Sequence, residues 1–197
     1  MDEYLASRWI AKPIRLLDCA YPVNGAIALI IESVEKAGAA RSPVYIHGIG
    51  QGHAGRLHFG SKEPELVTGG AQAARATYAM AGVGPADISN AQFYAPFTCT
   101  GFISLEDYGF CGRGDAAAFV ADGNTAPGGR LPVNTGGGQL SAFYLQGMTP
   151  LSEAVIQSRG EGGERQVGNR DIILATGIGG AQEYHGAAIL SPHASLS

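Results

Sequence analysis

Apolar residues along the chain occur in short blocks that alternate with polar and glycine-rich stretches. Blocks of strand length, bounded by turn-forming residues, predict five β-strands. These strands are expected at Val44–Ile49, Ile88–Tyr94, Ala116–Val120, Asp171–Thr176 and His185–Leu190. The glycine turn GIGG between the last two predicts that they form an antiparallel hairpin.

Three other segments space their apolar residues as one face of a helix does. The expected helices are Gly69–Ala81, Thr98–Gly109 and Ser141–Arg159. The first ends at glycines, which commonly stop helices. Because strands and helices alternate, the pattern predicts an α/β protein with a mixed sheet.

A nearly continuous apolar run stands nearer the N-terminus, within Leu16–Glu32. It predicts a short helical turn at Asn24–Ala26 that continues as a buried strand. The stretch His53–Pro64 is polar and is expected to be irregular.

Composition sets the broad class of the protein. The length of 197 residues fits one domain, and an apolar content of 45% is enough for a core. The net charge of −4 comes without a basic face, so nucleic acid is not an expected partner. No apolar run reaches about 18 residues, so no membrane span is expected. The N-terminus has no signal-peptide pattern, and the expected location is cytoplasmic.

Glycine is overrepresented, with 30 residues gathered in stretches such as HGIGQGHAG, NTGGG and TGIGGA. This clustering predicts tight turns near a ligand. Cys19, Cys99 and Cys111 fit neither a zinc site nor a disulfide framework and are expected to be buried, reduced thiols. His47, His53 and His58 have no metal-ligand spacing, so no metal site is expected.

Several motifs occur in a fixed order along the chain. They are LDCAYPVNGAIALII, NAQFYAPFT, LEDYGFCGRGDAAAFV, GGRLPVNTGGGQLS and GIGGA. From about Pro13 to Leu190 the sequence resembles the C-terminal half of the thiolase superfamily, and most closely its sterol-carrier-protein-X-type lipid-transfer members. The resemblance implies half of a five-layered αβαβα body, a mixed sheet with helices on both faces. Residues 1–197 would form this thiolase-like C-terminal domain, and the nucleophile-bearing N-terminal half would lie outside the chain.

The resemblance also assigns three site loops. Tyr94 stands where the first loop presents its polar group. Tyr144 replaces the histidine of the second loop, and Gly177-Ile178-Gly179 replaces the Cys-x-Gly of the third. A phenol has a pKa near ~10, so at neutral pH it is a poor base and a good hydrogen-bond donor. Loss of both the histidine and the cysteine is expected to disable Claisen chemistry.

Two phenols suit a retro-aldol cleavage of a β-hydroxyacyl-CoA. One phenol, its pKa lowered by the other or by a neighbouring dipole, would take the hydroxyl proton, and a donor would hold the enolate. Some lipid-transfer relatives are aldolases that shorten steroid side-chain acyl-CoAs to a 17-keto steroid and propionyl-CoA. The predicted catalytic residues are therefore Tyr144 and Tyr94, and the coenzyme A thioester is a substrate, with no cofactor expected.

The predicted substrate-binding residues lie on the same loops. They are Asn134, Gly136, Gly137, Gly138, Phe143, Gly177, Gly179 and Tyr184. Asn134 is expected to organise its loop by Asx-type hydrogen bonds. The alternative is that Tyr144 is a buried helix aromatic, that Tyr94 is an ordinary strand tyrosine and that Tyr184 is structural.

The resemblance implies three partners: an N-terminal thiolase half, a second copy of the thiolase-like subunit, and a protein with an OB-fold and a zinc ribbon. Two other functions remain open. The chain could belong to an acyl-CoA thiolase or acyltransferase that uses a cysteine on the missing half. It could instead be a non-catalytic half that scaffolds a partner.

Overall fold

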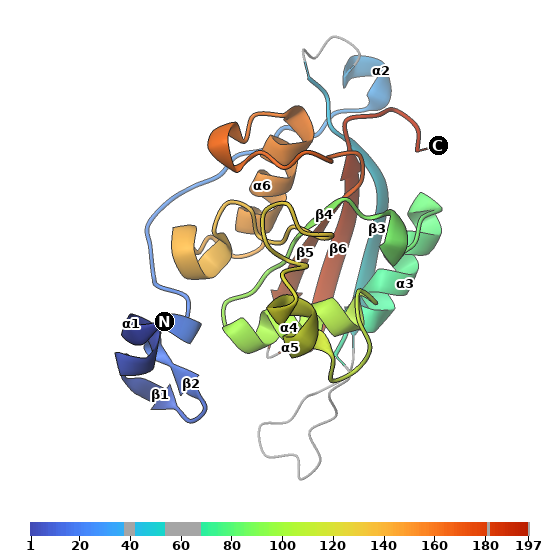
Figure 1. The fold of residues 1–197 in the computed structure, drawn as a ribbon. Helices are drawn as coiled ribbons and strands as arrows, with labels where there is room; N and C mark the ends of the chain where they lie inside the picture. Colours follow the sequence, from blue (N-terminus) through green and yellow to red (C-terminus); the bar gives the residue numbers. More distant parts are fainter. Residues whose placement is uncertain (38–41, 54–67, 181, 197) are drawn as a thin grey trace.

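The computed structural model describes residues 1–37, 42–53, 68–180 and 182–196. Its centre is a four-stranded sheet in the order β3-β6-β5-β4 (Figure 1). β6 (Tyr184–Ser191) pairs antiparallel with both β3 (Tyr45–His53) and β5 (Ile173–Gly179). β4 (Asn90–Gln92) pairs parallel with β5. The predicted mixed sheet and the C-terminal hairpin are confirmed.

Helices cover both faces of this sheet, as predicted (Figure 1). On one face Leu174 and Ile189 join the core of α3 (Gly70–Ala81). On the other face Ile173 and Leu190 pack with α6 (Met148–Arg159). Because successive strand residues point to opposite faces, one pair of strands supplies both cores.

The glycines of β3 allow α3 to lie directly on the strand. A Cβ on Gly48, Gly50 or Gly52 would collide with Thr77, with Ala81 or with the backbone of Gly69. Every second residue in this part of the strand therefore has only a hydrogen atom as its side chain, on the face that meets α3. The prediction that HGIGQGH forms a turn near a ligand is wrong, because these glycines serve close packing within a strand.

The segment from Ala116 to Ala121 is a helix, α5, where a strand was predicted. Its alternation was too short to decide, and alanine is a strong helix former. The Phe119 amide bonds to the carbonyl of Asp115 and starts the helical turn. The predicted helix before it is confirmed as α4 (Thr98–Asp107).

The predicted helix from Ser141 begins later than expected. A π-helical turn occupies Gly138–Ala142, Phe143 is extended (φ −149°, ψ 148°), and α6 starts only after Gly147. Tyr144 therefore lies on a loop before the helix. The apolar stripe that suggested one long helix spans two elements separated by this loop.

The N-terminal residues form a small unit beside the main body (Figure 1). It contains the short elements α1 (Asp2–Ala6), β1 (Trp9–Ala11), β2 (Ile14–Arg15) and a 3-10 turn at Leu16–Asp18. Other short elements are α2 (Val34–Ala37) and 3-10 turns at Pro85–Asp87 and Gly163–Arg165.

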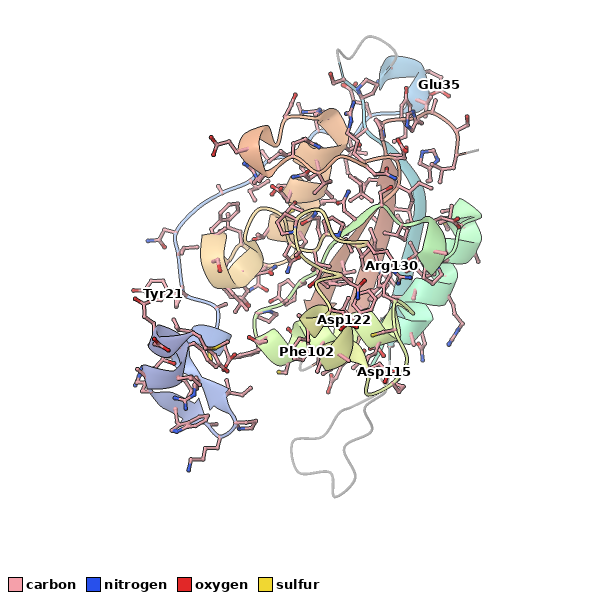
Figure 2. All side chains as sticks on the ribbon, viewed as in Figure 1. Tyr21, Glu35, Phe102, Asp115, Asp122 and Arg130 are labelled. Carbon is pink, nitrogen blue, oxygen red and sulfur yellow. The ribbon has the colours of Figure 1, made fainter. Side chains whose placement is uncertain are left out.

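The apolar run that follows this unit is not a buried strand. Residues 20–33 have no regular secondary structure, and the predicted helical turn at Asn24–Ala26 is absent as well. Ile30 and Ile31 are 89% and 78% exposed, and Tyr21 also lies at the surface (Figure 2). An apolar segment becomes a buried strand only beside a partner strand, and no described strand of this chain lies next to it.

The cysteines are free thiols, but Cys99 is exposed, which corrects the expectation that all three are buried. Cys19 and Cys111 are half-buried, and burial raises the pKa of each thiol. Among the described residues no helix has the length and apolar character needed to cross a membrane.

We expect Gly52→Ala to destabilise the intact protein by about 1–3 kcal/mol, because its Cβ would overlap the carbonyl of Gly69. Gly186→Ala is the matched control on the neighbouring strand, since a Cβ there meets nothing within 4 Å. Urea unfolding would measure both variants. Equal stability of the two would contradict the close-packing role of the β3 glycines.

Candidate functional site

The chain beyond β4 is held by side chains instead of by a neighbouring strand. Three consecutive amides each donate to a side-chain oxygen: Phe93 to Asn134 (2.7 Å), Tyr94 to Thr176 (3.0 Å) and Ala95 to Gln139 (3.0 Å). All three amide-bearing residues are buried, so an unpaired N–H there would be costly. The acceptors come from the loop after residue 133, from β5 and from the π-helical turn.

This arrangement brings the two predicted catalytic tyrosines together. The phenol oxygens of Tyr94 and Tyr144 lie 2.6 Å apart, with ring centroids 6.0 Å apart and ring planes at 49°. Tyr94 is 5% exposed, whereas Tyr144 is half-buried. Burial, and then the hydrogen bond with Tyr144, raise the pKa of Tyr94 above its usual range. The expectation that one phenol has a lowered pKa is therefore wrong for Tyr94.

A third polar side chain reaches this pair. The phenol of Tyr94 donates to the Oε1 atom of Gln146 over 2.8 Å. Gln146 has a left-handed backbone (φ 53°), which is uncommon outside glycine. The sequence carried no motif that singled it out, because its role depends on the loop that separates Tyr144 from α6.

The glycine run adopts a path that other residues resist. Gly137 and Gly138 have φ of 89° and 55°, and a Cβ on Gly136 would collide with the carboxylate of Glu153. Asn134 itself has φ of 50°. Its side-chain oxygen accepts from the amide of Phe93, so it joins this loop to β4 instead of forming the predicted Asx turn.

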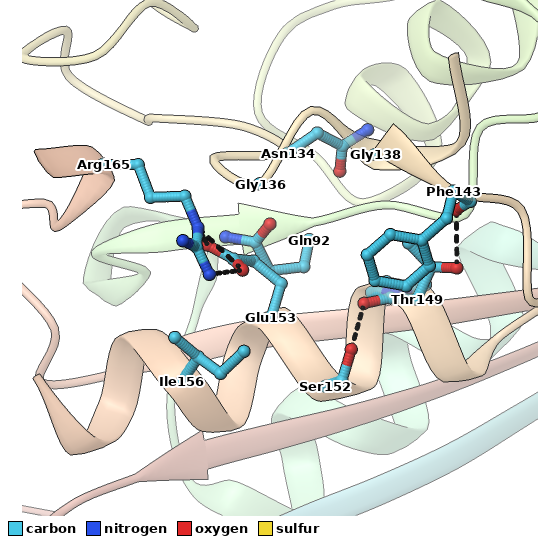
Figure 3. A pocket seen from close by; sticks show the side chains of 11 residues that line it. Gln92, Asn134, Gly136, Gly138, Phe143, Thr149, Ser152, Glu153, Ile156 and Arg165 are labelled. Carbon is cyan, nitrogen blue, oxygen red and sulfur yellow. Dashed lines mark hydrogen bonds and ion pairs between the residues drawn. The ribbon is translucent and has the colours of Figure 1, made fainter. Parts of the chain in front are cut away.

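A pocket of about 240 Å³ lies between the glycine run and α6 (Figure 3). The predicted binding residues among its lining are Asn134, Gly136, Gly138 and Phe143. Phe143, the residue before Tyr144, lines the pocket and is 40% exposed. Neither Tyr94 nor Tyr144 lines this pocket.

Glu153 of α6 is the centre of a polar network. Arg165, whose side chain is 45% exposed, donates to its carboxylate at 3.1 and 3.2 Å from Nε and at 3.1 Å from Nη2, and Figure 3 shows this pair. The same carboxylate accepts from Thr135 and Gln157, each at 2.8 Å. Thr135 stands directly before the glycines, so this network fixes their position. Sequence reasoning missed it, because Thr135 and Arg165 lie 18 and 12 residues from Glu153 in the chain.

The third loop meets the second at a glycine. A Cβ on Gly147 would lie 3.7 Å from the Cα of Gly177, so the backbones are in contact there. Gly179 pairs with Tyr184 at the end of the hairpin. The ring of Tyr184 is 50% exposed and packs edge-on against His53, with centroids 5.1 Å apart.

The histidines do not gather at one place. The Nε2 atom of His47 lies 2.9 Å from the carbonyl oxygen of His193. His53 packs on Tyr184, and His58 lies outside the described residues. Within the described ranges no group of three or more His, Cys, Asp or Glu side chains is arranged to hold a metal ion.

Comparison with known proteins agrees with the observed fold. Residues 50–192 match the family described as Thiolase C-terminal domain-like. The chain belongs to this family. It is 38% identical over 184 residues to the 17-hydroxy-3-oxo-4-pregnene-20-carboxyl-CoA lyase of Mycobacterium tuberculosis, covering 91% of the chain and 48% of that lyase. It is 37% identical over 188 residues to the steroid side-chain-cleaving aldolase of Thermomonospora curvata, covering 91% and 47%.

Solved structures extend the likeness of this thiolase C-terminal domain. The Ltp2-ChsH2(DUF35) aldolase superposes with a TM-score of 0.86 at 33% identity, over 99% of this chain and 52% of that chain. A monomeric SCP2-thiolase-like protein from Mycobacterium smegmatis, 19% identical with a TM-score of 0.63, shares the fold. The chain thus spans about half the length of the curated relatives it matches.

We expect Asn134→Gly to destabilise the protein by about 1–3 kcal/mol, because it tolerates the left-handed backbone but leaves the buried Phe93 amide unpaired. Asn134→Asp keeps an oxygen acceptor at the same reach and is the matched control. Thermal unfolding would compare the two. If Asn134→Gly is no less stable than Asn134→Asp, this hydrogen bond does not hold the loop.

Proposed function

We propose that residues 1–197 form the C-terminal half of a thiolase-like aldolase that cleaves a carbon–carbon bond of a β-hydroxyacyl-CoA. The observation that carries this proposal is the 2.6 Å contact between the phenols of Tyr94 and Tyr144. Tyr144 stands where members of the superfamily that perform Claisen chemistry use a histidine. The names of the two curated relatives, a carboxyl-CoA lyase and a side-chain-cleaving aldolase, support the same chemistry.

The reaction needs a proton acceptor and an oxyanion donor, and no covalent nucleophile. An ionised phenol takes the proton of the β-hydroxyl, and the electron pair left on that oxygen forms the ketone. The Cα–Cβ bond breaks, and its electrons pass to the thioester as an enolate. A proton delivered to Cα completes the shorter acyl-CoA. The second phenol stabilises negative charge by donating a hydrogen bond.

We propose a steroid side-chain acyl-CoA as the substrate, with a 17-keto steroid and propionyl-CoA as products. The names of the relatives support this choice. The pocket beside the glycine run holds about 240 Å³, below the roughly 300–1,000 Å³ usual for pockets that bury drug-sized ligands. A second half is therefore needed to complete a site for so large a substrate.

The loop residues would act as the walls of this site. The glycines from Gly136 to Gly138 would let the thioester approach the backbone, beside Asn134 and Phe143. Gly177 adjoins the second loop and would line the same space, with Gly179 and Tyr184 further out along the hairpin. The coenzyme A thioester is the substrate, and the proposal includes no separate cofactor.

The alternative of an acyl-CoA thiolase or acyltransferase has one observation in its favour. The chain is 31% identical over 184 residues to the acetyl-CoA acetyltransferase of Methanothermobacter thermautotrophicus. Such an enzyme would use a cysteine on the other half. A scaffold half without chemistry would need neither the phenol contact nor the buried position of Tyr94.

We propose three partners: the N-terminal thiolase half, a second copy of the thiolase-like subunit, and a protein with an OB-fold and a zinc ribbon. A solved structure named as an Ltp2-ChsH2(DUF35) aldolase, of which this chain covers 52%, supports an assembly of this kind. We propose a cytoplasmic location for it.

We expect Tyr144→Phe to lower kcat/KM at least ~100-fold with little loss of stability, because only a half-buried hydroxyl is removed. The assay incubates the complete complex with a tertiary β-hydroxyacyl-CoA, without free coenzyme A, and measures ketone and short acyl-CoA by mass. Tyr21→Phe, at an exposed tyrosine, is the control.

Unchanged turnover in Tyr144→Phe would remove this phenol from the mechanism. Wild-type protein that releases no ketone, but splits a 3-ketoacyl-CoA when free coenzyme A is added, would be a thiolase instead. Protein without either activity, in a complex that nevertheless assembles, would be the scaffold.

We expect the chain expressed alone to aggregate or to bind its missing half, because Ile30, Ile31 and Tyr21 leave an apolar run exposed. Light scattering would compare the chain with and without a co-expressed N-terminal half. An Ile30→Lys, Ile31→Lys double variant should be more soluble alone and should capture that half less well. A wild-type chain that stays monomeric and soluble would count against the half-domain proposal.

A further inference from the structure

The hydrogen bonds of the phenol pair have a fixed direction. The Tyr94 oxygen lies 2.6 Å from the Tyr144 oxygen and 2.8 Å from Oε1 of Gln146. A phenol has one proton to donate, and an amide oxygen has none. Tyr94 therefore donates to Gln146, and the contact between the two phenols must use the proton of Tyr144. The chain runs from Tyr144 to Tyr94 to Gln146.

This direction makes the two phenols unequal. Tyr94 is 5% exposed, its proton is engaged by Gln146, and a negative charge on it would face the lone pairs of Oε1. Burial raises the pKa of Tyr94 in the same sense. Tyr144 is half-buried and keeps lone pairs that can accept a hydrogen bond from a substrate hydroxyl.

The described side chains that bond to the pair or to the backbone beside it are uncharged. Thr176 of β5 and Gln139 of the π-helical turn, which bond the backbone of Tyr94 and Ala95, are neutral. The nearby carboxylate on α6, Glu153, is engaged by Arg165. Tyr144 is the ionisable group that contacts Tyr94.

We propose that Gln146 is a positioning residue that orients the protons of this pair, so that Tyr144 is the phenol that loses and regains a proton. The inference rests on the proposed aldolase function and deepens it. When Tyr144 is ionised, the Tyr94 proton turns from Gln146 to the Tyr144 oxygen, over 2.6 Å. When Tyr144 takes the substrate proton, the Tyr94 proton returns to Gln146, and no proton is gained or lost by the pair beyond that one.

Gln146 is exposed, and neighbouring residues hold its backbone. Its carbonyl accepts from the Thr149 amide (3.3 Å) and from the side chain of buried Gln139 (3.4 Å). A left-handed non-glycine residue is strained and persists where its surroundings fix it. Because asparagine tolerates this backbone well, Gln146 can be shortened without a new conformational strain.

Two variants separate orientation from simple support. Gln146→Asn is one methylene too short to reach the phenol, so the neutral pair loses an acceptor and ionises more easily. The ascending limb of kcat/KM against pH should then move to lower pH. Gln146→Glu keeps an acceptor and adds negative charge, which favours the neutral pair. Its limb should move to higher pH, and each shift should be about one pH unit.

Gln182→Asn is the matched control, since Gln182 also has a left-handed backbone (φ 74°) and lies in the turn between β5 and β6. Its pH profile should match that of the wild type. The Glu variant is decisive for the direction of the bond, because a carboxylate only accepts at this pH. If the amide nitrogen of Gln146 faced Tyr94, Glu would disrupt the contact as strongly as Asn.

Absorbance titration of tyrosinate in the complete complex provides a readout that needs no turnover. The Tyr144 step is identified as the one missing in Tyr144→Phe, and it should move down in Gln146→Asn and up in Gln146→Glu. Steps that do not move, or that move the same way in both variants, would overturn the proposal. Opposite shifts in a complex that cleaves no β-hydroxyacyl-CoA would support the orientation and reject the aldolase function.

Discussion

The candidate site depends on side chains that act as a substitute β-strand. Past Gln92 the sheet offers no neighbour to residues 93–95, yet these residues are buried. Three side-chain oxygens, from Asn134, Thr176 and Gln139, accept their amide protons. Each of these hydrogen bonds adds little net stability, but an amide that is left buried and unpaired costs about 1–3 kcal/mol. The loop that bears Tyr94 can therefore take its path only while all three surrounding segments are in place.

Because the acceptors come from separate segments, the same bonds assemble the site. Asn134 joins the glycine loop to the end of β4, and the hydrogen bond from Thr135 to Glu153 joins it to α6. Tyr144 follows that loop in the chain, and its phenol lies against the phenol of Tyr94. The position of the phenol pair thus depends on the hydrogen bonds that pair the buried backbone amides around it. A change in any of these polar contacts would move the second phenol as well as destabilise the fold.

The spacing of apolar residues was sufficient to predict the long helices and strands of the fold. The hairpin of β5 and β6, α3 and α4 were predicted with ends within a few residues, because each has a full period of apolar residues. The family motifs located Tyr94 and Tyr144, and the structure places the two together. Short segments failed: the five residues from Ala116 suit either a strand or a helix, and alanine propensity decided for the helix. The apolar stripe from Leu140 spans two elements, and no single residue of the sequence marks the boundary between them.

What the sequence could not predict depends on contacts distant in the chain. The role of Gln146 requires a loop geometry that appears only when Gln139 and Thr149 bond its carbonyl. The apolar run ending at Ile31 has the pattern of a buried strand but is exposed here. The apolar pattern of a segment indicates that it needs burial, and it does not indicate which chain covers it.

The exposed run and the incomplete pocket have the same physical origin. The space beside the glycine run holds about 240 Å³ and neither phenol lines it, so a site that excludes water around both phenols needs a further surface. Exclusion of water strengthens a phenol–phenolate hydrogen bond, since the local dielectric falls. The half proposed to cover the run at Ile30 and Ile31 is also the part proposed to complete the site beside Phe143. Assembly would then set the strength of the proton-transfer pair, and the isolated chain would hold its phenols in place without the environment they need.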